Sequence, residues 1–184
     1  MKKRILIILM FFILYIPKNI FATFEELDIN AKYYGVYMAN NLDALYESNS
    51  DQKVPIASIT KIMTAIVCID NIQDLNQTVN VNLSEVQKYY NEEYSVAGLR
   101  DGQEISYYDL IATMLIPSGA DSAACIAINV FGDYSKFIEA MNKKAKEIGM
   151  NSTSFTNPIG ADDQNNYSTV YDVALMMKYA LDND

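Results

Sequence analysis

Residues 55–64 read PIASITKIMT, and this segment predicts both a buried helix and a reactive serine. Pro55 punctuates a polar loop, and the residues from Ser58 to Ile72 are apolar on nearly every side, which is typical of a buried helix. Within that helix Ser58 and Lys61 are three residues apart, so they share a face, with Cβ atoms about 5–6 Å apart. The segment therefore places a hydroxyl near an amine.

A serine-lysine pair matters here because the 184-residue chain contains no histidine. This excludes Ser-His-Asp and Cys-His catalysis and any zinc site built on histidine. A serine nucleophile would need another base, and lysine is the usual substitute. Burial of Lys61 would lower its pKa and enlarge the neutral fraction that can accept a proton, and the helix start at Ser58 would favour developing negative charge. The spacing alone fits an N-cap serine and a lysine whose amine reaches solvent equally well.

A second S-x-x-K occurs at residues 50–53, SDQK. It lies in a polar loop where nothing would shield the lysine from water. We interpret Ser50 and Lys53 as parts of a solvated turn.

Composition excludes several other classes of protein. Acidic residues outnumber basic ones by 23 to 14 and the pI is about 4.5, which argues against a nucleic-acid partner. No G-x-G pair occurs, so no dinucleotide or P-loop fingerprint is present. With 51% hydrophobic and 20% charged residues the chain is globular. Its two cysteines, Cys68 and Cys125, lie in apolar segments and are expected to be buried free thiols. A disulfide between them is the alternative, which a secreted setting would permit.

Residues 1–22 predict a secretory signal peptide. Lys2-Lys3-Arg4 forms a basic start, residues 5–16 are apolar, and Ala22 is a small residue at the exit. The apolar run is short for a membrane span, which needs about 20 residues. A retained anchor is the alternative, because Ile20 is bulky for a position so near the cleavage site. We expect a secreted, extracytoplasmic protein that touches a membrane only through an uncleaved signal segment.

Residues 23–184 predict one domain of the α+β class in which helices outnumber strands. A hairpin at residues 33–37 and 44–46 is the only strand pair that we expect. Residues 80–102 are polar and tyrosine-rich, which favours an excursion over the surface. Helices are expected over 58–72, 107–116, 120–130, 134–148 and 169–181, and a loop over 151–166.

Several motifs follow residues 55–64 in order. Residues 97–102 (AGLRDG), 108–110 (YDL) and 114–123 (MLIPSGADSA) precede residues 141–150, 153–160 (TSFTNPIG), 168–169 and 172–174. Together these segments resemble the serine D-Ala-D-Ala carboxypeptidases, the low-molecular-mass penicillin-binding proteins of peptidase family S11. The resemblance covers essentially the whole mature chain up to Asp184.

This resemblance implies a fold and a mechanism. The fold would be of the serine β-lactamase/transpeptidase type, a helical cluster beside an antiparallel sheet. Ser58 would be the acylated nucleophile, Lys61 its general base, and Ser118 would relay a proton between Lys61 and the leaving amine. The substrate would be a peptidoglycan stem peptide, which loses its terminal D-Ala before water hydrolyses the acyl-enzyme. β-Lactams would acylate the same serine, and no metal or cofactor is implied.

Two features depart from the family pattern. The second motif is usually Ser-x-Asn, and Ala120 takes the place of the Asn whose amide would contact the substrate. The third motif, Lys-Thr/Ser-Gly on a central strand, has no counterpart, because no lysine after Ser118 precedes Ser/Thr-Gly. The missing cation should weaken binding of an anionic substrate to an acidic protein. We expect a C-terminally truncated catalytic region whose sheet is incomplete because its last strands are missing.

Two other functions remain open. One is a non-catalytic derivative that binds only stem peptide or a partner, which Ala120 and the missing third motif favour and the retained Ser58, Lys61 and Ser118 oppose. The other is a relative of the class A β-lactamases, which share the S-x-x-K helix. Such an enzyme needs a deacylating Glu in a loop after the second motif. Residues 151–166 contain no Glu, so this reading ranks last.

Overall fold

The computed structural model describes residues 29–82, 84, 87 and 94–182. The chain divides into two compact units, Met1–Ala31 and Lys32–Asp184. All of the helices and strands described below lie in the second unit. The predicted signal peptide, residues 1–22, lies outside the described residues.

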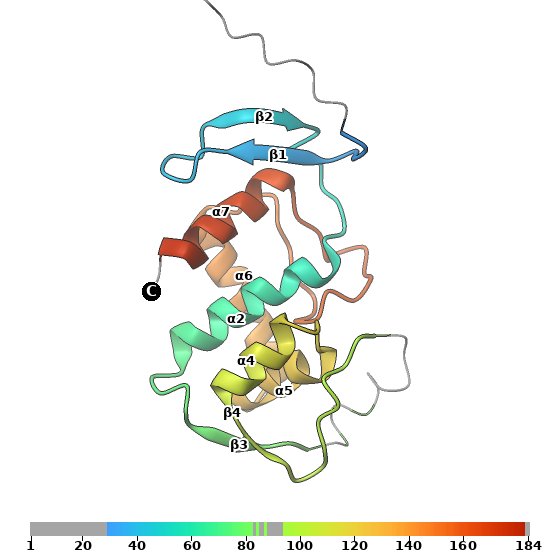
Figure 1. Cartoon of the computed structure of the whole chain (residues 1–184), viewed down its shortest axis with the longest axis vertical. Coiled ribbons are helices and arrows are strands. Elements are labelled where there is room, and N and C mark those ends of the chain that lie inside the picture. Colours follow the sequence, from blue (N-terminus) through green and yellow to red (C-terminus); the bar gives the residue numbers. More distant parts are fainter. Residues whose placement is uncertain (1–28, 83, 85–86, 88–93, 183–184) are drawn as a thin grey trace, which may run out of the picture. The chain divides into compact units, whose positions relative to one another are not determined.

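The predicted hairpin at the front of the domain is confirmed. Strand β1 (Tyr34–Tyr37) pairs antiparallel with β2 (Ala44–Ser48), and a bulge interrupts the register between Val36 and Tyr37. The hairpin lies against helix α7 (Val170–Asp182), where the ring of Tyr37 meets that of Tyr171 edge-on at a centroid distance of 5.9 Å (Figure 1). An isolated hairpin is marginally stable in water, so this contact with a helix supports it.

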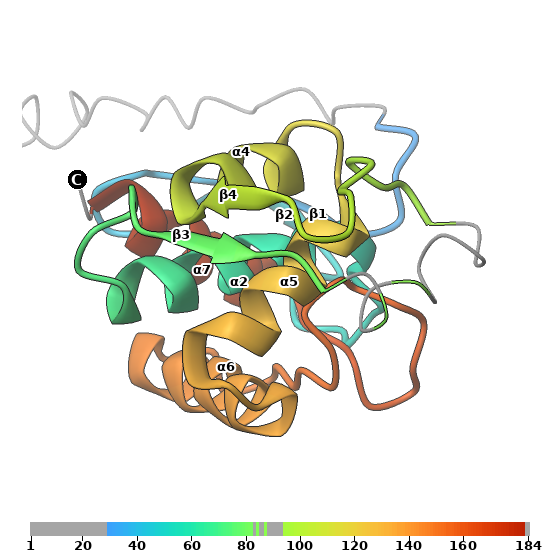
Figure 2. The same cartoon turned by 90° about the horizontal axis from the view of Figure 1, so that it is seen from below.

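A second antiparallel pair was not expected. Strand β3 (Thr78–Asn80) pairs with β4 (Glu104–Ser106), and the two lie side by side in Figure 2. The prediction that the front hairpin is the only strand pair was therefore wrong. Each of these strands has three residues, which is too short to show an alternating pattern, and a long connection separates them. Val79 pairs with Ile105, whose side chain is buried.

Helix α2 (Thr60–Asn71) runs through the helical cluster and follows a short 3-10 turn, Ala57–Ile59 (Figure 1). The predicted helices are confirmed to within about two residues: α4 (Tyr107–Leu115), α5 (Ala120–Phe131), α6 (Tyr134–Ile148) and α7. Helix α2 packs against α4, α5, α6 and α7, the other helices that the structure describes.

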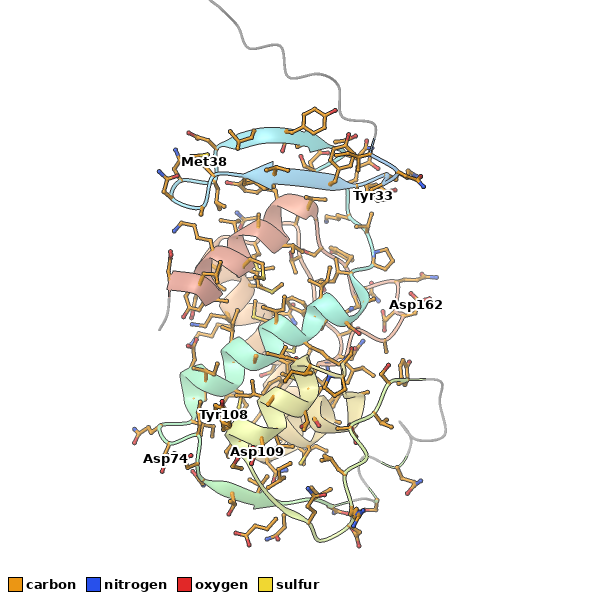
Figure 3. The ribbon with its side chains drawn as sticks, viewed as in Figure 1. Tyr33, Met38, Asp74, Tyr108, Asp109 and Asp162 are labelled. Carbon is orange, nitrogen blue, oxygen red and sulfur yellow. The ribbon has the colours of Figure 1, made fainter. Side chains whose placement is uncertain are left out.

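Polar side chains cap the starts of α4 and α6. Ser106 caps α4 by accepting a hydrogen bond from the Asp109 N–H at 3.0 Å, and Asp133 caps α6 by accepting from Ser135 N at 2.8 Å. Helix α6 ends at Gly149, whose φ is +96°. Figure 3 shows Tyr108 and Asp109 near Asp74, and the Tyr108 N–H donates to the Leu75 carbonyl at 2.9 Å.

The core lies between the helices. Small residues on α5 are almost fully buried, which lets α2 and α4 approach it closely. The largest fully buried side chains are Met63, Leu110, Met114, Ile126, Phe137, Met141, Met150, Phe155 and Met176. A helical cluster with small antiparallel sheets is the predicted α+β class. In the part of the chain described, no helix is long and apolar enough to cross a membrane.

Candidate active site

The structure brings the three predicted site residues, Ser58, Lys61 and Ser118, into direct contact. Lys61 Nζ donates to Ser58 Oγ at 3.1 Å, and Ser118 Oγ donates to the same oxygen at 2.9 Å. Ser58 lies in the 3-10 turn before α2, Lys61 lies in the first turn of α2, and Ser118 lies just before α5. The Lys61 amine, the Ser58 hydroxyl and the Ser118 hydroxyl thus form one hydrogen-bonded chain with Ser58 in the middle.

The serine is open to solvent, whereas the lysine is buried. Ser58 is exposed, and only 4% of the Lys61 surface is accessible. Burial lowers the pKa of Lys61 from 10.5 to about 8. At pH 7 about one molecule in ten would then carry the neutral amine, against about one in a few thousand for an ordinary lysine. The buried helix therefore creates a base that works near neutral pH.

The hydrogen bond between Lys61 and Ser58 can run in either direction. When Lys61 is charged, its ammonium donates to Ser58 Oγ. When Lys61 is neutral, the nitrogen lone pair can accept the Ser58 proton over the same 3.1 Å, which is the reach that a general base requires. The geometry suits activation of a serine nucleophile.

Two of the four non-glycine residues with positive φ in the described ranges lie at this site. Ala57, next to Ser58, has φ +45°, and Ser118 has φ +62°. Non-glycine residues in this left-handed region cost about 1–2 kcal/mol each. Such outliers persist where surrounding structure imposes them, often at functional sites. Here they occur at Ser118 itself and directly before Ser58.

Asp121 does not replace the amide that Ala120 lacks. Its carboxylate is fully buried and accepts hydrogen bonds from the backbone N–H groups of residues 97, 98 and 99 at 2.8–3.1 Å. It also accepts from Ser122 N at 2.9 Å. Asp121 thus ties the start of α5 to residues 97–99, and Ala120 is itself buried. The carboxylate anchors the second motif.

One contact of Lys61 could not be expected from residue types. Lys61 Nζ donates to the main-chain carbonyl of Ile159 at 2.8 Å, and Thr64 Oγ1 donates to the Pro158 carbonyl at 2.7 Å. A main-chain acceptor leaves no mark in a sequence. The sequence signal that could have pointed to this segment is its turn residues. Asn157, Pro158 and Gly160 together indicate a tight turn.

Two of the lysines after Ser118 pair with carboxylates away from the site. Lys144 bonds Asp70 at 2.8 Å and Glu147 at 3.0 Å, and Lys178 pairs with Asp182. Lys53 of the second S-x-x-K is exposed, with its amine 4.7 Å from the ring centroid of Tyr167, as expected for a solvated turn.

The cysteines are buried free thiols, as predicted. Cys68 and Cys125 make no disulfide, and burial raises the pKa of Cys68 to about 12, which leaves it a neutral, unreactive thiol. Within the described ranges no group of three or more Cys, Asp or Glu side chains could hold a metal ion.

Most of the chain matches known proteins. Residues 20–184 match the Peptidase_S11 family model, described as D-alanyl-D-alanine carboxypeptidase. The chain is 33% identical over 141 residues to the D-alanyl-D-alanine carboxypeptidase DacF of Bacillus subtilis, an alignment that covers 74% of this chain and 35% of the relative. It is 36% identical over 138 residues to the D-alanyl-D-alanine endopeptidase of Escherichia coli, covering 75% and 43%.

The fold has solved counterparts. The D-alanyl-D-alanine carboxypeptidase DacD from Francisella tularensis superposes with a TM-score of 0.79 and 27% identity, over 85% of this chain and 38% of that one. The chain therefore spans less than half the length of each of these three relatives.

Proposed function

Because the chain belongs to the peptidase S11 family of D-alanyl-D-alanine carboxypeptidases, we propose that it is a serine acyl-transfer enzyme acting on stem peptides that end in D-Ala-D-Ala. The observation that carries this proposal is the 3.1 Å contact between a buried lysine amine and an exposed serine hydroxyl. A lysine that only covered the surface would hold its amine in water, where solvation is most favourable. Lys61 instead keeps a poorly solvated amine at the serine.

The proposed reaction begins with proton transfer. Neutral Lys61 takes the proton of Ser58 while Oγ forms a bond to the carbonyl carbon of the penultimate D-Ala. The proton then passes through the Ser118 hydroxyl to the nitrogen of the terminal D-Ala, and the C–N bond breaks. Water attacks the resulting ester, gives a proton back through Lys61, and frees Ser58. The first transfer runs along the 3.1 Å contact between Lys61 Nζ and Ser58 Oγ, and the 2.9 Å contact holds the Ser118 hydroxyl beside the oxygen that becomes the ester.

β-Lactams are proposed as acylating inhibitors of the same serine. Their strained amide would open when Ser58 Oγ attacks its carbonyl, with the ring nitrogen taking the proton. No metal or cofactor enters any step, because Lys61 supplies the base and Ser58 the nucleophile.

A non-catalytic stem-peptide binder is the second candidate. It is favoured by the orientation of Asp121, whose carboxylate is bonded to residues 97–99 and so does not substitute for the amide that Ala120 lacks. Burial of Lys61 weighs against it, because a binding protein gains nothing from a lysine of lowered pKa.

We also propose an extracytoplasmic location, in the cell wall or at the outer face of the membrane. Residues 1–22 have the pattern of a secretory signal peptide, and the proposed substrate lies outside the membrane. The acidic composition argues against a nucleic-acid partner.

The experiment that tests the function is an intact mass measurement after incubation with excess penicillin. A penicilloyl adduct that disappears in Ser58→Ala supports acyl transfer by Ser58. If the folded wild-type protein forms no adduct, the proposal of acyl transfer is wrong. That result would favour the non-catalytic stem-peptide binder.

A further inference from the structure

The turn that faces Lys61 is organised by one side chain, Asn157. Its Oδ1 accepts hydrogen bonds from three successive backbone N–H groups, Ile159 at 3.3 Å, Gly160 at 2.8 Å and Ala161 at 2.9 Å. Its Nδ2 donates to the Ala161 carbonyl at 3.2 Å. A single amide therefore closes the whole turn on itself.

This turn is pressed onto the start of α2. The Ile159 carbonyl receives the Lys61 hydrogen bond, and the Pro158 carbonyl receives that of Thr64. Pro158, Ile159 and Thr64 are all buried. On the other side, a Cβ added to Gly160 would lie 1.9 Å from the Ala57 carbonyl oxygen and 3.0 Å from the Ser58 nitrogen. The turn thus contacts both the base and the peptide unit before the nucleophile.

We propose that Asn157 is a positioning residue, which holds the Ile159 carbonyl on the Lys61 amine and keeps that amine shielded from water. With one N–H of Lys61 bonded to a fixed carbonyl, rotation about the last side-chain bond is restricted. The lone pair of the neutral amine is then directed at Ser58. This inference rests on the proposed acyl transfer for its kinetic consequence, but its structural content can be measured independently.

Among the residues that the structure describes, no charged group competes with burial in setting the proton affinity of Lys61. The carboxylates on the surrounding elements bond to other partners. Asp121 accepts from the N–H groups of residues 97–99, and Asp172 accepts from Ser152 N and Thr153 Oγ1. Asp70 forms an ion pair with Lys144. Asp162 and Asp163, which follow the turn, are exposed, and Asp162 lies on the loop at the edge of the molecule in Figure 3. Cys68 on α2 is neutral, and Cys125 on α5 is a buried thiol.

Among the described residues, burial is the one cause of the lowered pKa of Lys61. Loosening the turn should therefore admit water and let this pKa rise towards its ordinary value. Each unit of increase would reduce the neutral fraction at pH 7 about tenfold.

The first test measures Lys61 directly in the full chain, without substrate. Lysine labelled with ¹³C is titrated by NMR, and the Lys61 signal is assigned from its loss in Lys61→Arg. In wild type we expect a midpoint near the pKa of about 8. Asn157→Ala should raise it by about one unit or more. Thr64→Val, a milder change that removes only the bond to Pro158, should shift it in the same direction by less.

Asn142→Ala is the matched control. Asn142 holds the same loop from α6 through the Phe155 carbonyl and N–H, at 2.7 and 2.9 Å, but does not touch the turn. It should leave the Lys61 midpoint unchanged. If neither Asn157→Ala nor Thr64→Val moves the midpoint, or if Asn142→Ala moves it equally, the proposal is overturned. If Asn157→Ala does not fold, Thr64→Val decides alone.

The second test measures the rate of penicillin acylation against pH. Asn157→Ala should acylate about tenfold more slowly at pH 7 and approach the wild-type rate at high pH, because only the neutral fraction changes. A loss that is uniform across pH would contradict the proposal, since it would report general damage. If wild type forms no adduct at any pH, the proposed function fails, and the NMR titration still decides the role of Asn157.

Discussion

Ser118 Oγ lies 2.9 Å from Ser58 Oγ, although sixty positions separate the two residues in the chain. Ser118 lies in the short connection between α4 and α5, and its backbone is left-handed, with φ +62°. Ser58 is thereby reached from one side by a hydroxyl and from the other by the Lys61 amine. A proton can move between Lys61 and a group bound at Ser58 without passing through bulk water.

Ser118→Ala should slow penicillin acylation by about 10²–10³-fold, the usual loss when a proton-transfer group is removed. Acylation rates followed by intact mass would measure this. Ser122→Ala is the control, because Ser122 is a buried serine on α5 whose hydroxyl meets Thr113 at 2.9 Å, away from Ser58. Equal losses in the two variants would mean that Ser118 acts only through packing.

The stability of the protein should depend on pH through Lys61. Its pKa is about 8 in the folded protein and 10.5 ordinarily, so between these values the unfolded chain holds a proton that the folded one lacks. Burial of the amine therefore lowers the free energy of unfolding by its full amount below about pH 8. This loss disappears as the pH rises to about 10.5.

Lys61→Met removes this titration. The wild-type Tm should rise relative to that of Lys61→Met as pH increases from about 8 to about 10.5. Thermal unfolding across that range would show the trend. Lys143→Met is the control, since the Lys143 side chain is 79% exposed and its removal takes no buried charge from the protein. A constant difference between wild type and Lys61→Met would contradict the lowered pKa.

Much of the helical architecture was predictable because its signals are local. The apolar run of α2, Pro117 after α4, and Gly149 at the end of α6 mark their elements without reference to the rest of the fold. The pairing of β3 with β4 was not predictable, because it depends on a long-range contact between two three-residue segments. Tertiary packing decides such short strands, and propensity does not.

The candidate site likewise contains contacts that the sequence predicts and contacts that it does not. The proximity of Ser58 and Lys61 follows from their spacing of three residues, which places two side chains on one face both in a 3-10 turn and in an α-helix. The proximity of Ser118 to these two residues was predicted from the family resemblance, because no local rule brings Ser118 to the start of α2. The hydrogen bonds from Lys61 to the Ile159 carbonyl and from Gly160 N–H to Asn157 are visible only in the structure, because a backbone partner has no sequence signature.

Asp121 should be essential for stability. Its buried carboxylate accepts four backbone N–H bonds, and Asp121→Ala would leave these donors without an acceptor. We expect a loss of about 3–4 kcal/mol in the free energy of unfolding, measured with urea. Asp109→Ala removes an exposed carboxylate that accepts from Ser106 Oγ, and should cost about 0.5 kcal/mol. Similar losses in the two variants would show that Asp121 is not the anchor of residues 97–99.

Gly160→Ala and Gly149→Ala separate backbone strain from steric overlap. Both glycines have positive φ, +80° and +96°, so alanine at either position costs about 1–2 kcal/mol of strain. The new methyl group at Gly149 meets nothing within 4 Å, whereas at Gly160 it would overlap the Ala57 carbonyl oxygen. We therefore expect Gly160→Ala to lose about 1–3 kcal/mol more in unfolding free energy than Gly149→Ala.

The same pair should differ in chemistry. Displacing the turn at Gly160 would move the Ile159 carbonyl away from Lys61 and disturb the peptide that precedes Ser58, so penicillin acylation by the folded variant should fall steeply. Gly149 lies at the end of α6, and Gly149→Ala should acylate at the wild-type rate once differences in folded fraction are corrected. Equal acylation by the two folded variants would show that the turn can shift without affecting Ser58, because the overlap at Ala57 would then have been relieved elsewhere.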